Sequence, residues 1–575
     1  MIVTAPSSAP AAEKRAPRRP SGGLRRTFAL SLAEGAVSLA SAALLLWLCL
    51  RIRINPMDRI GQVSGLAGIQ LRLMVMMALT VLLYLLVSRW KPGAATRFGA
   101  AAVAGLATAV IAAGNVVSLR GTAWPIYANW GDVGNLQQWA YDVIDGVALP
   151  AMYPPGFPHL LAWTSELFFD GDMGKATKWV MIGFLALSGP AVYMAWRMLL
   201  PPLWALGIGV TATLPVIDPY KPYSALVLAV VIPVFAKMCD VVLHSTELGR
   251  RRSAATGAGL GLLLAAMFLL YSGWFLWSSV GVVVLFAMVL GGLARSGGIR
   301  GLVDGLVPLA SALAVFLALA GTYLVRLLGS GATTKDAYFY FDTWVDPAYF
   351  TMWASGTPGP LRSLGWPPPG ELAGVGLFTL VLVAGLGVAL TLGLRQPMVL
   401  TLAACTASAF LLRYWYAAHM ERDQAVQLYP RTSHQLMYCL IALTGLALYY
   451  AGKRVRVWLR LHEAALRGGA RRTAASRRPR AGVVGALCAL GLLFGLAGSA
   501  TVNAYMPQDP GLNSSGQFAW FSHNIRQADG QCPRYAVKGE CSPYVPPLRG
   551  PYRPPAVQKP FERLTPPPAL SVTPK

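Results

Sequence analysis

Six carboxylates lie in one long hydrophilic stretch, residues 120–175, and three of them are candidates for chemistry. Asp132 stands between Gly131 and Val133-Gly134, where the backbone can approach a substrate closely. Asp142 and Asp145 follow three residues apart, a spacing that places both on one face of a short helix. A carboxylate in such a place can take a proton from a hydroxyl group as a general base. Asp132 is our first candidate for that base, and Asp142 or Asp145 could assist or replace it. An Asx turn and a solvated helix face are the structural alternatives.

A second hydrophilic stretch, residues 326–371, combines carboxylates with aromatic rings. Its centre reads KDAYFYFDTWVDPAYF and contains Asp342, Trp344 and Asp346. Aromatic rings can cover the C–H faces of a sugar while carboxylates accept hydrogen bonds from its hydroxyls. We therefore predict that these three residues bind sugar. The alternative is the belt of aromatic residues that many membrane proteins carry at the membrane interface.

Basic residues in two further stretches are candidates for binding a phosphate. Arg431 and His434 lie in residues 413–435, immediately before an apolar run, and Lys221 lies in the short turn DPYKPY. The planar guanidinium of arginine matches the geometry of a phosphate, and lysine supplies a point charge. The alternative is that these side chains only anchor helix ends at the membrane surface.

The composition shows what kind of protein must position these residues. Of the 575 residues, 55% are apolar and only 13% are charged, whereas soluble domains carry about 25% charged residues. The mean hydropathy of +0.50 also excludes an ordinary cytosolic enzyme. The net charge of +25 does not indicate a nucleic-acid partner, because the basic residues lie between long apolar runs and not in a stripe with aromatic residues. We predict an all-α polytopic membrane protein in contact with membrane lipid.

Apolar runs long enough for a transmembrane helix, about 20 residues, occur about thirteen times. They are centred near residues 39, 79, 108, 186, 209, 233, 264, 283, 313, 383, 406, 443 and 491. The two runs within 257–293 could also be one span and a re-entrant piece, joined at Ser272-Gly273. The acids inside these runs, such as Glu34 and Asp240, are too scattered for a proton-coupled transporter, so we expect them to be structural.

The distribution of charge predicts the orientation. If the N-terminus is cytoplasmic, thirteen crossings place the basic segments 1–26, 89–97, 250–252, 295–300 and 452–481 on the inner side, as the positive-inside rule requires. The same assignment places the stretches 120–175, 326–371 and 413–435 and the C-terminus outside.

An outer-face location restricts the chemistry. Nucleotide sugars are absent there, so a glycosyltransferase would take its sugar from a polyprenyl phosphate. It would need a carboxylate base for the acceptor hydroxyl and cations for the leaving lipid phosphate. The chain contains neither a GxGxxG nor a GxxxxGK[ST] motif, and we expect no cofactor. No ligand spacing predicts a metal site, although the loop carboxylates leave a divalent ion open.

Several stretches resemble a known family. The segments GDVGNLQQWAYDVIDG, MYPPGFPHLLAW, DPYKPYSAL, LYSGWFLWSSVGV and YFYFDTWVDPAYF are similar to the actinobacterial galactan 5-O-arabinofuranosyltransferase (AftA-type) family of the GT-C superfamily. The resemblance covers roughly residues 30–505. It implies a plasma-membrane enzyme that transfers arabinofuranose from a decaprenyl phosphate donor to a cell-wall galactan, a polysaccharide acceptor. It also favours Asp132 as the base, because GT-C enzymes carry theirs in the first large outer loop.

The expected organisation is a basic cytoplasmic tail (1–26), a GT-C-like transmembrane catalytic domain (27–500) and an outer proline-rich tail (501–575). We expect the tail to be mostly extended, without a core, and to carry a disulfide between Cys532 and Cys541, which lie on the oxidising side. Three other functions stay open: a GT-C transferase that uses a mannose donor, a flippase of a lipid-linked saccharide, and a ligase of the O-antigen type.

Overall fold

The structure is a computed structural model that describes residues 22–331, 377–423, 431–466, 478–509, 511 and 514–543. These residues form an all-helical bundle, and ten of its helices are long and apolar enough to cross a membrane. The described part therefore agrees with a polytopic α-helical membrane protein. The predicted sugar-binding residues Asp342, Trp344 and Asp346 lie outside the described residues.

The long helices follow the predicted apolar runs. They are α1 (Gly22–Cys49), α2 (Arg59–Val87), α3 (Pro92–Ser118), α6 (Met173–Arg197), α9 (Pro222–Leu243), α11 (Arg250–Leu270), α12 (Gly273–Gly331), α15 (Pro397–Ala418), α17 (Thr432–Leu466) and α18 (Arg478–Ala504). The apolar helix α14 (Leu377–Gly393) is shorter. A second short apolar stretch, Pro202–Val216, consists of α7 (Pro202–Trp204), η1 (Ala205–Val210), α8 (Thr211–Thr213) and η2 (Leu214–Val216).

Two interruptions of the helical backbone separate apolar runs that follow each other closely in the sequence. α11 ends at Leu270 and α12 begins at Gly273, and the two helices pack along each other. The apolar residues 257–293 thus belong to two helices. α12 itself is interrupted at Gly298, whose φ of 60° and ψ of −152° are not helical. An L-residue rarely adopts such a φ, so the glycine allows the chain to turn between two apolar runs.

The centre of the bundle is built on small residues. The apolar window of α3 is completely buried, and its sequence is rich in alanine and glycine. At Gly105, a Cβ atom would collide with the carbonyl oxygen of Ser38 in α1. Small residues let helix backbones approach closely in a membrane, where packing replaces the hydrophobic effect as the main attraction between helices.

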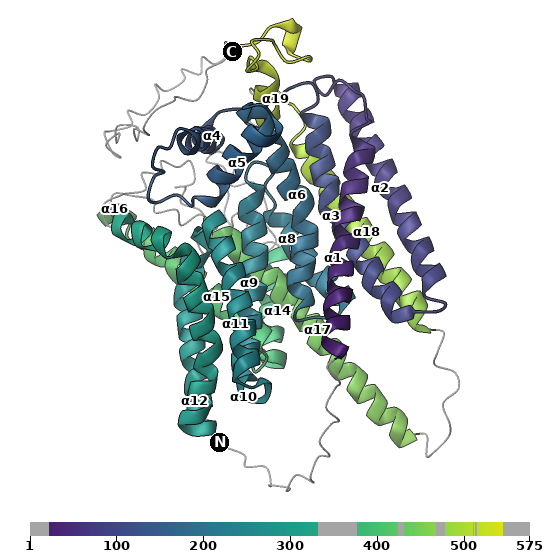
Figure 1. Cartoon of the computed structure of the whole chain (residues 1–575). Coiled ribbons are helices and arrows are strands. Elements are labelled where there is room, and N and C mark those ends of the chain that lie inside the picture. The colour runs from purple at the N-terminus through teal and green to yellow at the C-terminus, as the bar shows by residue number, and fades with distance from the viewer. Residues whose placement is uncertain are drawn as a thin grey trace, which may run out of the picture.

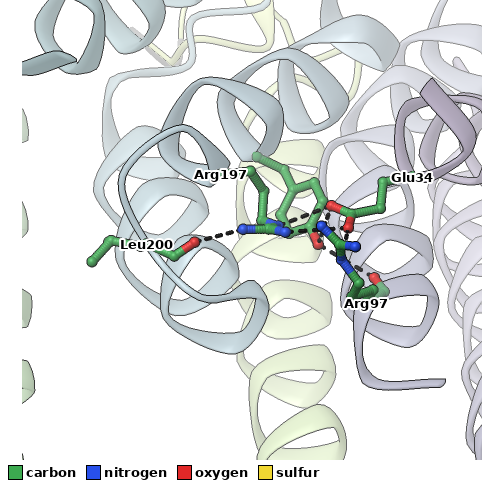
Figure 2. A network of polar contacts seen from close by, with 5 residues as sticks. Glu34, Arg97, Arg197 and Leu200 are labelled. Atoms are coloured by element: carbon green, nitrogen blue, oxygen red, sulfur yellow. Dashed lines mark hydrogen bonds and ion pairs between the residues drawn. The ribbon is translucent and has the colours of Figure 1, made fainter. Parts of the chain in front are cut away.

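A buried ion-pair network joins three of these helices (Figure 2). The carboxylate of Glu34 in α1, only 1% exposed, pairs with Arg97 in α3 and with Arg197 in α6. The Nε of Arg197 lies 2.9 Å from Glu34, and its Nη1 donates to the carbonyl oxygen of Leu200. Glu34 therefore has the structural role predicted for it.

Shorter helices cover the two ends of the bundle. α4 (Gly131–Ile144), α5 (Gly156–Phe168) and α19 (Gln517–Asn524) gather at the end where α6, α9, α12 and α17 begin (Figure 1). We call this the site end. α10 (Ser245–Leu248) lies at the opposite end. The remaining short elements are α16 (Met420–Asp423) and the 3-10 turn η5 (Val537–Gly539).

The C-terminal tail differs from the prediction. Up to Ser542, its described residues are folded against the loop that precedes α4, and they bury Ser522 and His523 completely. Cys532 and Cys541 form a disulfide whose Cα atoms lie 5.6 Å apart. The expectation of an extended tail is wrong for this part because α19 shares the core of a neighbouring loop and needs none of its own.

Candidate functional site

The site centres on an ion pair between Asp132 and Lys221. Asp132 lies in the first turn of α4, where the helix dipole favours a negative charge. Lys221 occupies the position immediately before α9. The side chains are 35% and 14% exposed, so the pair is accessible from one side. Two residues that are 89 positions apart in the sequence thus meet at the site end of the bundle.

Two turns hold this pair together. In the turn before α9, the carboxylate of Asp218 accepts a hydrogen bond from the backbone N–H of Tyr220 over 2.9 Å, an Asx turn. The backbone N–H of Asp132 then donates to the hydroxyl of Tyr220 over 2.8 Å. The turn that supplies Lys221 therefore also fixes the backbone at Asp132.

Opposing effects set the charge of Asp132. Burial raises its pKa, but the nearby charges of Lys221 and Arg431 and the hydrogen bond from Lys221 outweigh that effect, so the pKa of Asp132 is lowered from its ordinary value. Burial and the charge of Asp132 raise the pKa of Tyr220. At neutral pH the site therefore holds a carboxylate beside a neutral phenol.

The two other residues predicted to bind the donor phosphate lie around the same pair. Nη1 of Arg431 donates to the hydroxyl of Tyr271 over 3.0 Å, and the charge of Arg431 acts on Asp132. The ring of His434 lies 6.4 Å from the ring of Trp274, centre to centre, and the side chain interacts electrostatically with Asp218 and Arg431. Lys221, Arg431 and His434, predicted from three separate positions, are thus brought together near Asp132.

Three tyrosines that were given no role in the sequence complete the wall of the site. The hydroxyls of Tyr153 and Tyr223 lie 2.8 Å apart, and the ring of Tyr223 lies 6.3 Å from that of Tyr271. Burial raises the pKa of Tyr153. The motifs YPPGFP, DPYKPY and LYSGW contain these residues, so the signal was present in the sequence, but no spacing rule connects such distant tyrosines.

Asp142 and Asp145 do not join this cluster. They lie at the other end of α4, about 15 and 20 Å from Asp132 at 1.5 Å per residue. Asp142 is buried and accepts a hydrogen bond from Gln138 over 3.0 Å. Burial raises the pKa of Asp142. Asp145 caps the C-terminus of α4 and is exposed. A short helix was correctly predicted here, but one of the two carboxylates is buried and the other is exposed, so they do not share a solvated face. The length of α4 separates both of them from the cations.

Within the described residues, no group of three or more His, Cys, Asp or Glu side chains could hold a metal ion. Neither a comparison with protein-family models nor a search of curated proteins finds a match to this chain. The fold and the site thus define a class: a multi-pass helical membrane protein with a carboxylate, two cations and a histidine at one end of its bundle.

Proposed function

We propose that the protein is a GT-C-type glycosyltransferase that moves arabinofuranose from a polyprenyl phosphate to a cell-wall galactan at the outer face of the plasma membrane. The observation that carries this proposal is the meeting of Asp132 with Lys221, Arg431 and His434. Such a transferase needs one proton acceptor next to a set of cations for a lipid phosphate. The sugar and the galactan acceptor come from the family resemblance of the sequence.

In the proposed topology the site end faces outward. Thirteen crossings follow if α12 is counted as two spans and if α14 and the stretch Pro202–Val216 each cross the membrane. The positive-inside rule supports this orientation, because the basic residues at the end of α17 then lie in the cytoplasm.

The side chains suggest how the transfer proceeds. The donor phosphate, a singly charged diester, binds between Lys221 and Arg431 and competes with Asp132 for the lysine. The freed carboxylate accepts the proton of the acceptor hydroxyl while that oxygen bonds to the anomeric carbon. The bond from this carbon to the phosphate oxygen breaks, and the lipid phosphate leaves with the electron pair. The cations stabilise the negative charge that develops on it.

An apolar cavity supports a lipid-linked donor. It has a volume of about 410 Å³, lies between α12 and α15, and is open on one side, where Val284, Met288 and Leu411 are about half exposed. Val280, Val284 and Met288 line one side, and Leu400, Ala404 and Leu411 line the other. Val280 lies about 9 Å along α12 from Trp274, which contacts His434. A polyprenyl chain whose phosphate occupied the cation cluster would find this cavity within reach.

A transfer assay tests the proposal. Membranes that contain the protein are incubated with radiolabelled polyprenylphosphoryl-arabinose and a galactan-like acceptor, and parallel reactions contain the mannose donor. We expect label to enter the acceptor from the arabinose donor only. Transfer from the mannose donor alone would change the sugar. Movement of the intact donor across the membrane without transfer would identify a flippase, and transfer of a whole saccharide from its lipid would identify a ligase.

A further inference from the structure

The described residues between Tyr505 and Ser542, which we call the C-terminal segment, are tied to the loop that leads into α4. Thr122 donates from its hydroxyl to the carbonyl oxygen of Ser522 over 2.6 Å. The indole N–H of Trp124 donates to the carbonyl oxygen of Arg526 over 3.2 Å. The imidazole of His523 bonds through Nε2 to the carbonyl oxygen of Ser118, at the end of α3, over 2.7 Å. The segment therefore forms part of the surroundings of Asp132.

The contacts concentrate on a strained turn. Tyr127 and Ala128 have φ angles of 73° and 51°, in the left-handed region that residues other than glycine rarely adopt. The N–H of Tyr127 donates to the carbonyl oxygen of Phe518 over 3.0 Å. The N–H of Ala128 donates to the hydroxyl of Ser522 over 3.2 Å. Such a conformation persists only where the surrounding structure holds it. Here the C-terminal segment supplies the partner of Tyr127 and one of the two partners of Ala128, whose N–H also donates to the carbonyl oxygen of Pro125 over 3.0 Å.

The same segment also reaches the turn that carries Lys221. The hydroxyl of Tyr505 donates to the carboxylate of Asp218 over 2.9 Å. The ring of Phe518 lies 4.5 Å from that of Tyr127 and 6.0 Å from that of Tyr220. One segment therefore contacts both turns whose side chains form the Asp132–Lys221 pair.

We propose that the C-terminal segment positions the Asp132–Lys221 pair, with Tyr505 and Ser522 as its positioning residues. Ser522 holds the left-handed turn before Asp132, and Tyr505 holds the Asp218 turn before Lys221. That the pair acts in sugar transfer rests on the proposed function, whereas its positioning does not.

The disulfide strengthens this arrangement from outside the site. Asn524 and Arg526 exchange backbone hydrogen bonds with Ser542, over 2.8 and 3.0 Å. Cys541 precedes Ser542 and is bonded to Cys532. The cross-link thereby holds the end of the segment against the residues that follow α19.

Amine labelling tests the positioning without a need for catalytic activity. The ammonium of Lys221 must leave Asp132 and lose its proton before a membrane-impermeant acylating reagent can react with it. The labelling rate of each lysine is measured by mass spectrometry in the full-length protein and in the variants Tyr505→Phe and Ser522→Ala. Lys175, which is 52% exposed, serves to normalise the rates. Lys178, whose ammonium donates to the carbonyl oxygens of Leu119 and Thr122, reports whether the whole loop has come away.

We expect Lys221 to react about two- to tenfold faster in both variants, the effect of one hydrogen bond of ordinary net strength. Lys178 should not change. The control variant Tyr535→Phe makes the same chemical change in the same segment, where the ring lies close to Gly121, and should label like the wild type. An unchanged rate at Lys221, or an equal rise at Lys178, would overturn the proposal.

Kinetics then link the positioning to transfer. In both variants kcat/KM for the donor should fall by about the same two- to tenfold, because the base and one of the two cations proposed to bind the donor phosphate are displaced together. A wild-type protein without transferase activity would refute the proposed function, whereas the labelling result would still decide whether the segment positions the pair.

Discussion

Replacement of Asp132 by asparagine separates its chemistry from its structural role. The amide side chain would keep an oxygen that can accept from Lys221, but it could not take up a proton. The side chains of Asp132 and Lys221 are 35% and 14% exposed, and such a partly buried ion pair stabilises a protein by about 1–2 kcal/mol, between the values for exposed and buried pairs. General-base catalysis contributes about 10²- to 10⁴-fold, or roughly 3–5 kcal/mol at 1.36 kcal/mol per tenfold. Activity should therefore fall far more than stability.

The assay compares kcat for sugar transfer with the melting temperature of the purified protein. Asp145→Asn is a matched control, because it removes the same charge from the other, exposed end of α4. We expect a drop of about 10²-fold or more for Asp132→Asn with nearly wild-type melting, and almost no change for Asp145→Asn. Nearly full activity of the Asp132→Asn protein would refute the assignment of the base. A large loss in Asp145→Asn would move the base to the far end of α4.

Three further predictions concern other parts of the molecule. Arg431→Ala should reduce kcat/KM for the donor by roughly ten- to a hundredfold, the effect of one charge-assisted contact. Arg454→Ala, in the part of α17 away from the site, should leave it unchanged. Equal effects of the two changes would mean that Arg431 only anchors the helix at the membrane surface. Glu34→Gln should destabilise the protein by about 3 kcal/mol or more, because two guanidinium groups lose their buried partner. An unchanged melting temperature of the variant in detergent would contradict this prediction. Burial lowers the pKa of His523 to about 4, below the 6.5 of a free histidine. Between these two values the folded segment binds fewer protons than the unfolded segment. Its free energy of unfolding should therefore decrease by up to about 3 kcal/mol as the pH falls from 6.5 to 4. Hydrogen exchange of residues 517–525 should show this loss, and His523→Gln should abolish it.

The helices could be predicted from the sequence because each requires only a local property, a long apolar run. The break at Gly298 was also predictable, since the basic segment 295–300 separates two such runs. Asp132, Lys221, Arg431 and His434 could be selected by residue type and by their position at the ends of apolar runs. Their meeting at one place could not, because it depends on how α4, α9 and α17 pack.

The contribution of the C-terminal segment could not be predicted for a different reason. Tyr127 and Phe518 are joined through the backbone, and backbone hydrogen bonds leave no pattern in the residue types. Proline-rich composition describes only the end of the tail, and it concealed the folded part around α19. Asp142 was misleading because its burial and its bond to Gln138 give it a local structural role that its spacing did not reveal.

A structure with a bound donor analogue would test the central claim most directly. The analogue would be a polyprenyl phosphonate that carries arabinofuranose and cannot be cleaved. We predict that its phosphonate lies within hydrogen-bond distance of Lys221 and Arg431, with the anomeric carbon facing Asp132 and the lipid chain between α12 and α15. A phosphonate bound elsewhere, for example at the basic end of α17, with Lys221 still paired to Asp132, would contradict the assignment of this site.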